Sequence, residues 1–278
     1  MNHRVKLLLD LITLKAKLNN DINAKLSVDE LKIIYGLDSN YYKYNHLIDK
    51  YINFRNKYDD LCKLFGKKCV AKELSEITMD TICYAGNLEY YEILPTYNLR
   101  YIYGSLFYGL NEVYNLENLE KVFGDTHFEY IESAEGLDNL EIIEGCSIFK
   151  NLKSSEGLYN LRKIGKDAKF PNLESAIYLN SLEEIGKCAI FNKLKSAKGL
   201  YNLKKIGNFA SFPFLESAEG LNKLESIYGV ANFNSLISPR GLEHLKNPGT
   251  KQYYGDCFDF YVFKHKEQIE CIKKYIKR

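Results

Sequence analysis

The chain repeats itself with a fixed period. Residues 152–165 read LKSSEGLYNLRKIG and residues 194–207 read LKSAKGLYNLKKIG, so the second stretch is a near-copy of the first. The basic period is half of that separation, because single residue types recur at every twenty-first position along this part of the chain. Apolar columns with a fixed period of about 20 to 25 residues are typical of solenoids. The recurring columns run from Ser133 to Ser238, Leu137 to Leu242, Leu140 to Leu245, Ile143 to Ile227 and Phe128 to Phe233.

The repeat unit, LxSAxGLxNLxxIGxxAxF, is interpreted as one coil. Stacked coils place equivalent residues about 4.8 Å apart, along the hydrogen-bonding direction of a parallel sheet. The Leu, Ile and Phe columns then fill one continuous core, and the glycine after Ile suits a tight bend. Segments that start at Leu116 and Asn98 also fit the unit, the second with one residue missing. The sequence therefore predicts a parallel β-solenoid of about seven coils over residues 95–247.

The segment LESAIYLNSLEEIG, from Leu173 to Gly186, resembles the leucine-rich repeats of the BspA-type bacterial proteins, whose unit reads LxxIxIPxxVxxIGxxAF. The unit here ends in AxF rather than AF, and each turn is about two residues shorter. The pattern LxSAxGLxNLxxIxG is also similar to the receptor L-domain solenoid. The resemblance covers residues 95–247 and implies a leucine-rich-repeat-like solenoid whose sheet face binds another macromolecule, with no catalytic residue. The matching positions are Leu173, Ala176, Tyr178, Leu182, Ile185, Gly186 and Ala189.

Charges explain why the near-copies lie two periods apart rather than one. Glu132, Lys153, Glu174, Lys195 and Glu216 alternate in one column, and the positions after the second leucine alternate in the same way. Opposite charges on neighbouring strands contribute about 0.2–1 kcal/mol per pair, and like charges repel. We therefore expect each coil to contact both of its neighbours through charges that fix the register. A charge-coded docking surface is the alternative interpretation.

Different patterns flank the repeats. One stripe of an amphipathic helix is formed by Leu7, Leu8, Leu11, Leu14 and Leu18. SVDE at residues 27–30 is a capping box for a second helix that Gly36 would end. Residues 40–65 read as a longer helix or a helix pair. Residues 257–263 read as a strand and the last residues as a helix. The predicted fold class is α+β: a helical N-terminal domain (1–94), a leucine-rich-repeat-like parallel β-solenoid (95–247) and a C-terminal strand-plus-helix cap (248–278).

Two outward-facing sets of columns are candidates for a binding surface. The first set carries Ile148, Lys169, Ile190 and Phe209, and its apolar content is unusual for a solvated face. Either a partner or another part of this chain is expected to cover it. The second set lies beside the serine column and is equally compatible with a solvated sheet face. Its residues are Glu135, Glu156, Ile177, Lys198 and Glu219.

Composition and motifs exclude several classes of protein. The net charge of +2 lacks the concentrated basic excess of a dedicated polyanion binder. The five histidines form no HExxH or HxH, and no phosphate-binding glycine loop occurs, so we expect no enzyme, cofactor or metal site. The seven cysteines have no zinc spacing, which favours free thiols in a reducing cytoplasm. No stretch reaches the roughly 18 apolar residues of a membrane span.

The leading hypothesis is a cytoplasmic, non-enzymatic protein that holds or blocks a protein partner through the solenoid face, the N-terminal helices or both. The Lys-, Asn-, Tyr- and Ile-rich composition is compatible with an AT-rich bacterium or its phage, so an inhibitor of a host defence protein is a more specific hypothesis. The rival hypothesis is nucleic-acid binding by N-terminal helices in which basic residues interleave with tyrosine. Its candidate residues are Tyr41, Tyr42, Lys43, Tyr44 and Arg55.

Overall fold

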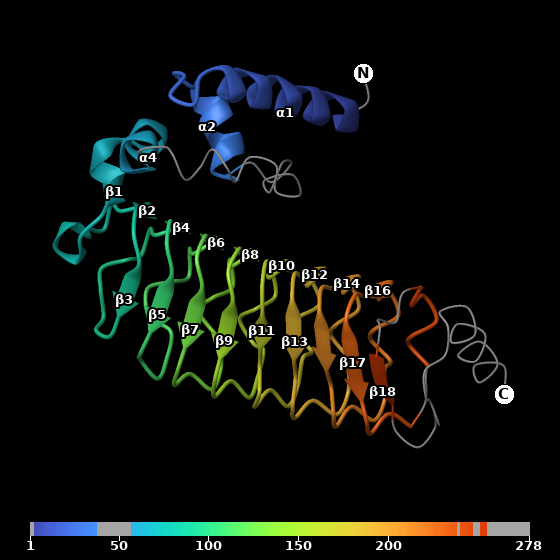
Figure 1. The fold of residues 1–278 in the computed structure, drawn as a ribbon. Coiled ribbons are helices and arrows are strands. Elements are labelled where there is room, and N and C mark those ends of the chain that lie inside the picture. The colour runs from blue at the N-terminus through green and yellow to red at the C-terminus, as the bar shows by residue number, and fades with distance from the viewer. Residues whose placement is uncertain (1–2, 38–56, 238–239, 247–250, 255–278) are drawn as a thin grey trace. The chain divides into compact units, whose positions relative to one another are not determined.

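The computed structural model describes residues 3–37, 57–237, 240–246 and 251–254 (Figure 1). The chain divides into two compact units, Met1–Lys72 and Glu73–Arg278. The first unit is mainly helical, and the second is a parallel β-solenoid with coils of about 21 residues. This arrangement confirms the predicted α+β class.

The helical unit contains α1 (His3–Asn20), α2 (Val28–Ile34) and α4 (Lys57–Phe65), followed by the short 3₁₀ helix η2 (Lys67–Cys69) and the strand β1 (Val70–Ala71). Four residues of the predicted leucine stripe of α1 are confirmed as buried, namely Leu7, Leu11, Leu14 and Leu18, and the burial of Leu8 is not described. Such a stripe gives an amphipathic helix one face to pack on its neighbours.

The predicted capping box of α2 is also present. The Ser27 hydroxyl accepts a hydrogen bond from the Glu30 N–H (3.2 Å), and the Glu30 carboxylate accepts one from the Ser27 N–H (2.8 Å). Lys17 of α1 forms an ion pair with Glu30 (2.9 Å) and so links the two helices. Gly36 has a φ of +59°, a backbone conformation that suits glycine directly after a helix end.

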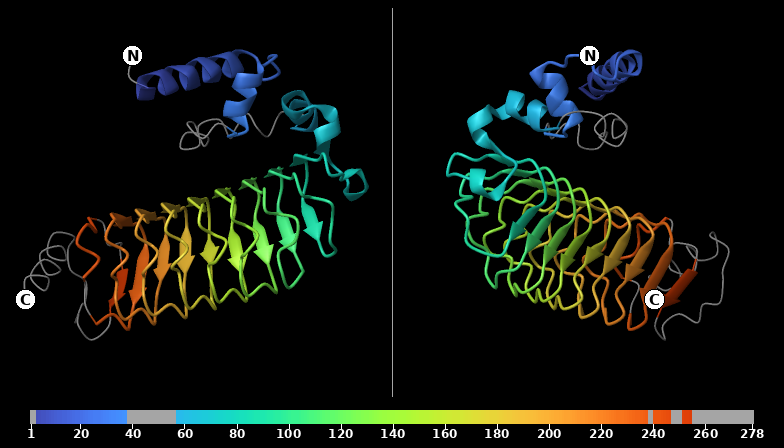
Figure 2. Two further views of the ribbon diagram at one scale, coloured as in Figure 1. Left: turned by 180° about the vertical axis from the view of Figure 1, so that it is seen from behind. Right: turned by 60° about the vertical axis from the view of Figure 1, so that its left-hand side comes forward.

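The solenoid unit begins with the 3₁₀ helix η3 (Leu74–Glu76) and then alternates between two sheets, sheet A and sheet B. Strands within each sheet lie side by side and are parallel (Figure 2). The solenoid strands of sheet A are β2 (Cys83–Tyr84), β4 (Tyr101–Ile102), β6 (Lys121–Val122), β8 (Ile142–Ile143), β10 (Lys163–Ile164), β12 (Glu184–Ile185), β14 (Lys205–Ile206) and β16 (Ser226–Ile227). Those of sheet B are β3 (Leu88–Tyr90), β5 (Leu106–Tyr108), β7 (Thr126–Phe128), β9 (Ser147–Phe149), β11 (Ala168–Lys169), β13 (Cys188–Ile190), β15 (Phe209–Ser211), β17 (Val230–Phe233) and β18 (Lys251–Tyr254).

The register follows the sequence period. Ile164 pairs with Ile185, one full period away, while Ile102 pairs with Val122, in the coil that lacks one residue. Strands β2 and β3 lie upstream of residue 95, where the repeat first becomes recognisable in the sequence. The first coil therefore pairs with the next coil in both sheets although its sequence lacks the full repeat motif. Strand β18 pairs with β17 at the other end, and the predicted strand at 257–263 and the helix after it lie outside the described residues.

A stack of phenylalanine rings fills the core. Each ring of this column is fully buried, and neighbouring centroids are 4.6 to 5.4 Å apart. Tyr108 and Tyr90 continue the stack toward the first coil. The rings lie nearly parallel because the parallel register places identical residues directly above one another. The stacked residues are Phe128, Phe149, Phe170, Phe191, Phe212 and Phe233.

Asparagine side chains join successive coils, a role that the sequence pattern did not reveal. The side-chain amide of Asn160 donates to the Asp138 carbonyl (2.6 Å), and that of Asn202 donates to the Asn180 carbonyl (2.6 Å). These bonds satisfy carbonyl oxygens on bends that no strand covers. The asparagine of the GLxNL segment therefore links coils, and equivalent bonds come from Asn98, Asn118 and Asn139.

Ion pairs join neighbouring coils. In most of them an acid pairs with a base of the following coil, whereas Arg100 and Lys121 pair with an acid of the following coil, Glu120 and Glu144. Exposed or partly exposed pairs contribute only about 0–1 kcal/mol each, so their regularity marks the register more than it adds stability. The pairs with a base of the following coil include Glu132–Lys153 (2.7 Å), Glu141–Arg162, Glu183–Lys204 (2.8 Å), Glu184–Lys205 (3.2 Å) and Glu225–Lys246 (3.5 Å).

The prediction that each basic coil contacts both neighbours is wrong at two positions. The Glu216 N–H donates to the Lys195 carbonyl (3.0 Å), yet among the described residues Lys195 forms no ion pair. Lys204 pairs with the preceding coil and not with Glu225 of the next one. A lysine bonded to the earlier acid is drawn away from the later one, and an exposed lysine loses side-chain entropy by pairing. The alternation of acidic and basic coils, most of them paired with one neighbour, matches the near-identity of every second coil.

Replacing Phe191 with alanine is expected to lower the free energy of unfolding by about 3–5 kcal/mol, because it leaves a cavity in the ring stack. Phe214→Ala is the matched control, since Phe214 is 57% exposed, and it should change stability by no more than about 0.5 kcal/mol. Urea denaturation of both variants measures the difference. Equal losses in the two variants would contradict the inward position of the phenylalanine column.

Candidate functional site

The first set of candidate residues lies on the outer face of sheet B. Ile148, Lys169 and Ile190 are at equivalent positions of β9, β11 and β13, and each is half-buried. Their strand neighbours Ala168 and Ala189 are fully buried. Since side chains alternate between the two faces of a strand, the three candidates point away from the core. We call this row the second outer column.

Phe209 belongs to a parallel row, two positions earlier in each coil. It pairs in register with Cys188, and both are half-buried. In the coils before it, aspartate and cysteine alternate: an Asp167 carboxylate oxygen accepts a hydrogen bond from the Cys188 N–H (3.4 Å), as Asp125 does from the Cys146 N–H (2.7 Å). We call this row the first outer column. Burial and the neighbouring Asp167 raise the pKa of the Cys188 thiol, so this cysteine stays neutral.

The apolar surface extends further than the candidate residues. Phe107 and His127 continue the second outer column, with stacked rings whose centroids are 5.1 Å apart. Val230 continues the first outer column beyond Phe209. His127 lies one full period before Ile148, so the repeat itself locates it, although it was not among the candidates. Phe107 was missed because its coil is one residue short, as the pairing of Leu106 with Thr126 shows.

The second set of candidates does not lie on either sheet. Glu135, Glu156, Ile177, Lys198 and Glu219 lie on turns that follow the serine column, where the structure has isolated bridges such as Ser154–Ser175. Ile177 is 54% exposed. Turns at one end of this row border a shallow cleft of about 770 Å³ with an acidic lining. The carboxylates there are Glu112, Glu117, Glu132, Glu135 and Asp138.

One coil departs from the pattern beside Ile177. Glycines with positive φ, such as Gly157 (+91°) and Gly199 (+103°), follow this row, and a Cβ at Gly199 would collide with the Ala176 carbonyl. Tyr178 occupies the glycine position without a positive φ. The preceding coil compensates for the missing glycine, because Ser155 stands there in place of the usual alanine. The buried Ser155 hydroxyl accepts a hydrogen bond from the Tyr178 N–H (3.2 Å) and donates one to the Ser175 carbonyl (3.1 Å).

The most buried charges of the solenoid lie on sheet A. Lys121, only 4% exposed at its side chain, and Lys163 both form ion pairs with Glu144 (2.9 Å each). Burial raises the pKa of Glu144, but the two lysine charges outweigh it and hold that pKa below the ordinary glutamate value. A carboxylate saturated by two ammonium groups is a poor base, and the cluster is interpreted as structural.

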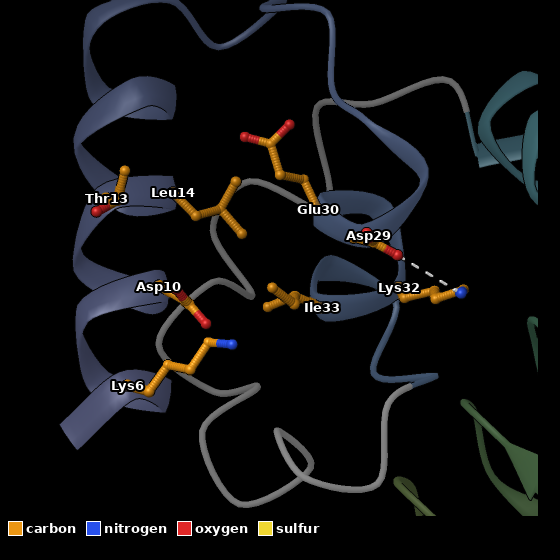
Figure 3. A pocket seen from close by; sticks show the side chains of 8 residues that line it. All are labelled: Lys6, Asp10, Thr13, Leu14, Asp29, Glu30, Lys32 and Ile33. Carbon is orange, nitrogen blue, oxygen red and sulfur yellow. Dashed lines mark ion pairs between the residues drawn. The ribbon is translucent and has the colours of Figure 1, made fainter. Parts of the chain in front are cut away.

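The helical unit has a pocket of its own, between α1 and α2 (Figure 3). It measures about 460 Å³, and its polar lining mixes both charges: Lys6 and Asp10 from α1, and Asp29 and Lys32 from α2. Asp29 and Lys32 form an ion pair (3.6 Å). This arrangement pairs no nucleophile with a base, so we assign it no chemistry.

Within the described ranges, no group of three or more His, Cys, Asp or Glu side chains is placed to hold a metal ion. Among the helices described, none combines the length and the apolar character needed to cross a bilayer. The nucleic-acid candidates Tyr41, Tyr42, Lys43, Tyr44 and Arg55 lie outside the described residues.

No protein-family model, curated protein or solved structure matches this chain.

Ser155→Ala is expected to lower the free energy of unfolding by about 1–3 kcal/mol, because it leaves the Tyr178 N–H without its acceptor. Tyr178→Gly in the same chain should restore most of that loss, since glycine can adopt the positive φ of the other coils. Urea denaturation of the two single variants and the double variant measures the coupling. Additive effects would show that the two departures are independent.

Proposed function

We propose that this chain is a non-enzymatic protein-binding scaffold and that the outer face of sheet B is its contact surface. The observation that carries the proposal is the apolar content of both outer columns. Phe107, Ile148, Ile190, Phe209 and Val230 all face away from the core. Apolar side chains gathered on an outer face, here interrupted by polar coils, are typical of an interaction site.

The frame beneath these side chains supports the same proposal. Each strand of sheet B is hydrogen-bonded to its neighbours in adjacent coils, and the aromatic stack packs under it. Side chains on such a frame are ordered before binding, so association costs less conformational entropy than on a loop. The polar residues of the face, such as Asp167 and Lys169, alternate with apolar coils and would fix the orientation of a partner.

The similarity of the repeat to leucine-rich repeats fits this role, since those repeats bind macromolecules through their sheet face. We extend the proposal to a cytoplasmic inhibitor that blocks a host defence protein on behalf of a phage or mobile element. The free cysteines and the composition support that setting. The face carries few cations, and Lys169 lies 3.6 Å from Asp167, which disfavours a nucleic-acid ligand there.

Ile190→Glu is expected to leave the melting temperature nearly unchanged and to weaken capture of the bound protein from the native host about tenfold, or about 1–2 kcal/mol. The matched control is Ile237→Glu, because Ile237 is 72% exposed and lies after β17, outside the face. Quantitative affinity capture with mass spectrometry compares both variants with the wild type.

Two outcomes would overturn the choice of face. Unchanged capture by Ile190→Glu would move the contact elsewhere, with the turns around Ile177 as the next candidate. A lower melting temperature of the free Ile190→Glu protein would show that another part of this chain covers the face.

A further inference from the structure

From β7 to β13, the two outer columns of sheet B match each other coil by coil. In the apolar coils, Cys146 stands beside Ile148 and Cys188 beside Ile190. In the polar coils between them, Asp167 stands beside Lys169, and Asp125 beside His127 in the same way. This part of the face is thus divided into apolar coils and polar coils that alternate along the solenoid.

The two coils that follow add apolar surface to the same face. Phe209 and Val230 extend the first outer column, and small polar side chains, Ser211 and Asn232, stand beside them in the second. These coils carry no charge in either outer column, so they place no like charges opposite a partner.

The pattern is self-complementary under one symmetry operation. When two such faces pack on each other with a two-fold axis parallel to the solenoid axis, each coil meets its own counterpart and the two columns exchange places. Lys169 then faces Asp167 of the second copy, and Asp167 faces Lys169. In the apolar coils, Ile190 faces Cys188 of the second copy, so apolar surface covers apolar surface.

The reversed arrangement lacks this match. A two-fold axis along the strands would keep the columns and reverse the order of coils. About the coil of Lys169, this places Lys169 against Lys169 and Asp167 against Asp167 of the second copy. Like charges facing each other across an interface cost several kcal/mol. About the coil of Ile190, the same axis places Lys169 against Ser211 and Asp167 against Phe209, so neither charge meets an opposite charge. The parallel arrangement pairs both charges.

The area is sufficient for a specific dimer. Sheet B has nine strands, which at about 4.8 Å spacing and about five residues of width including the bends present roughly 600–700 Å² per copy. Two copies would bury about 1,300 Å² in total, within the range of about 1,200–2,000 Å² for stable, specific interfaces.

We propose that the occupant of this face is a second copy of the chain, packed sheet B against sheet B with the solenoid axes parallel. This inference rests on the proposed function, because it names the protein that the same face binds.

Sedimentation velocity of the full chain from low to high micromolar concentration tests the inference. The wild type should shift from monomer to dimer across this range. Lys169→Asp and Asp167→Lys should each raise the dimer dissociation constant about tenfold or more, because each places like charges opposite one another. An equimolar mixture of the two variants should recover the dimer, since the introduced aspartate of one copy then faces the introduced lysine of the other.

Lys193→Asp is the control for net charge, because Lys193 is exposed on the turn after Phe191, outside the face, and should not affect association. Melting curves check that each variant is folded, and Lys169→Asp alone tests the face if Asp167→Lys does not fold. If the wild type stays monomeric while Ile190→Glu still weakens capture of the host protein, the inference that a second copy occupies the face is overturned. The proposed function then stays intact. A dimer that Lys169→Asp does not weaken, or that mixing does not restore, would place self-association on another face and also overturn the inference.

Discussion

Parallel hydrogen bonding between equivalent residues of adjacent coils is the constraint on which the rest of the structure depends. A strand spacing of about 4.8 Å leaves no room for mismatched side chains in the core, so each inward-facing position must accept a similar residue above and below. Phe170 must stack on Phe149 and Phe191, and the glycine before Leu200 must clear the Ala176 carbonyl. The fixed period of the repeat is the sequence consequence of that spacing.

Much of this architecture could be predicted from the sequence because a repeat reports the same contact several times. The inward Phe column, the α2 capping box and the short coil near Ile102 all have local signals, and each is confirmed. The direction of the ion pairs could not be predicted in the same way. Alternating charges fit pairing with either neighbour, and the choice of Lys204 for the preceding coil depends on side-chain paths. The sequence did not predict that the Ile177 row lies on turns, because an isolated bridge at the serine column and a full strand give the same periodic pattern in the sequence.

Departures from the repeat are as informative as the repeat. Ser155 and Tyr178 differ from the other coils together, and a single hydrogen bond connects the two changes. Stacking of the coils does not require apolar side chains on the outer face of sheet B, because the coil with Asp167 and Lys169 stacks with polar ones. The coils that carry Ile148 and Ile190 instead place apolar side chains on this outer face, and the proposal of a protein contact rests on them. The protein-binding proposal therefore derives from the same register that builds the core.

Native-state thiol labelling tests this register most directly, because cysteines stand at contrasting positions. Cys146 and Cys188 are half-buried on the outer face, whereas Cys83 is fully buried on sheet A. Alkylation of dilute, folded protein at mildly alkaline pH, which offsets the raised pKa of the Cys188 thiol, is read out by mass spectrometry. The account predicts that Cys146 and Cys188 are modified while Cys83 reacts only after unfolding. Protection of Cys146 and Cys188 equal to that of Cys83 in the dilute protein would contradict the accessible outer face.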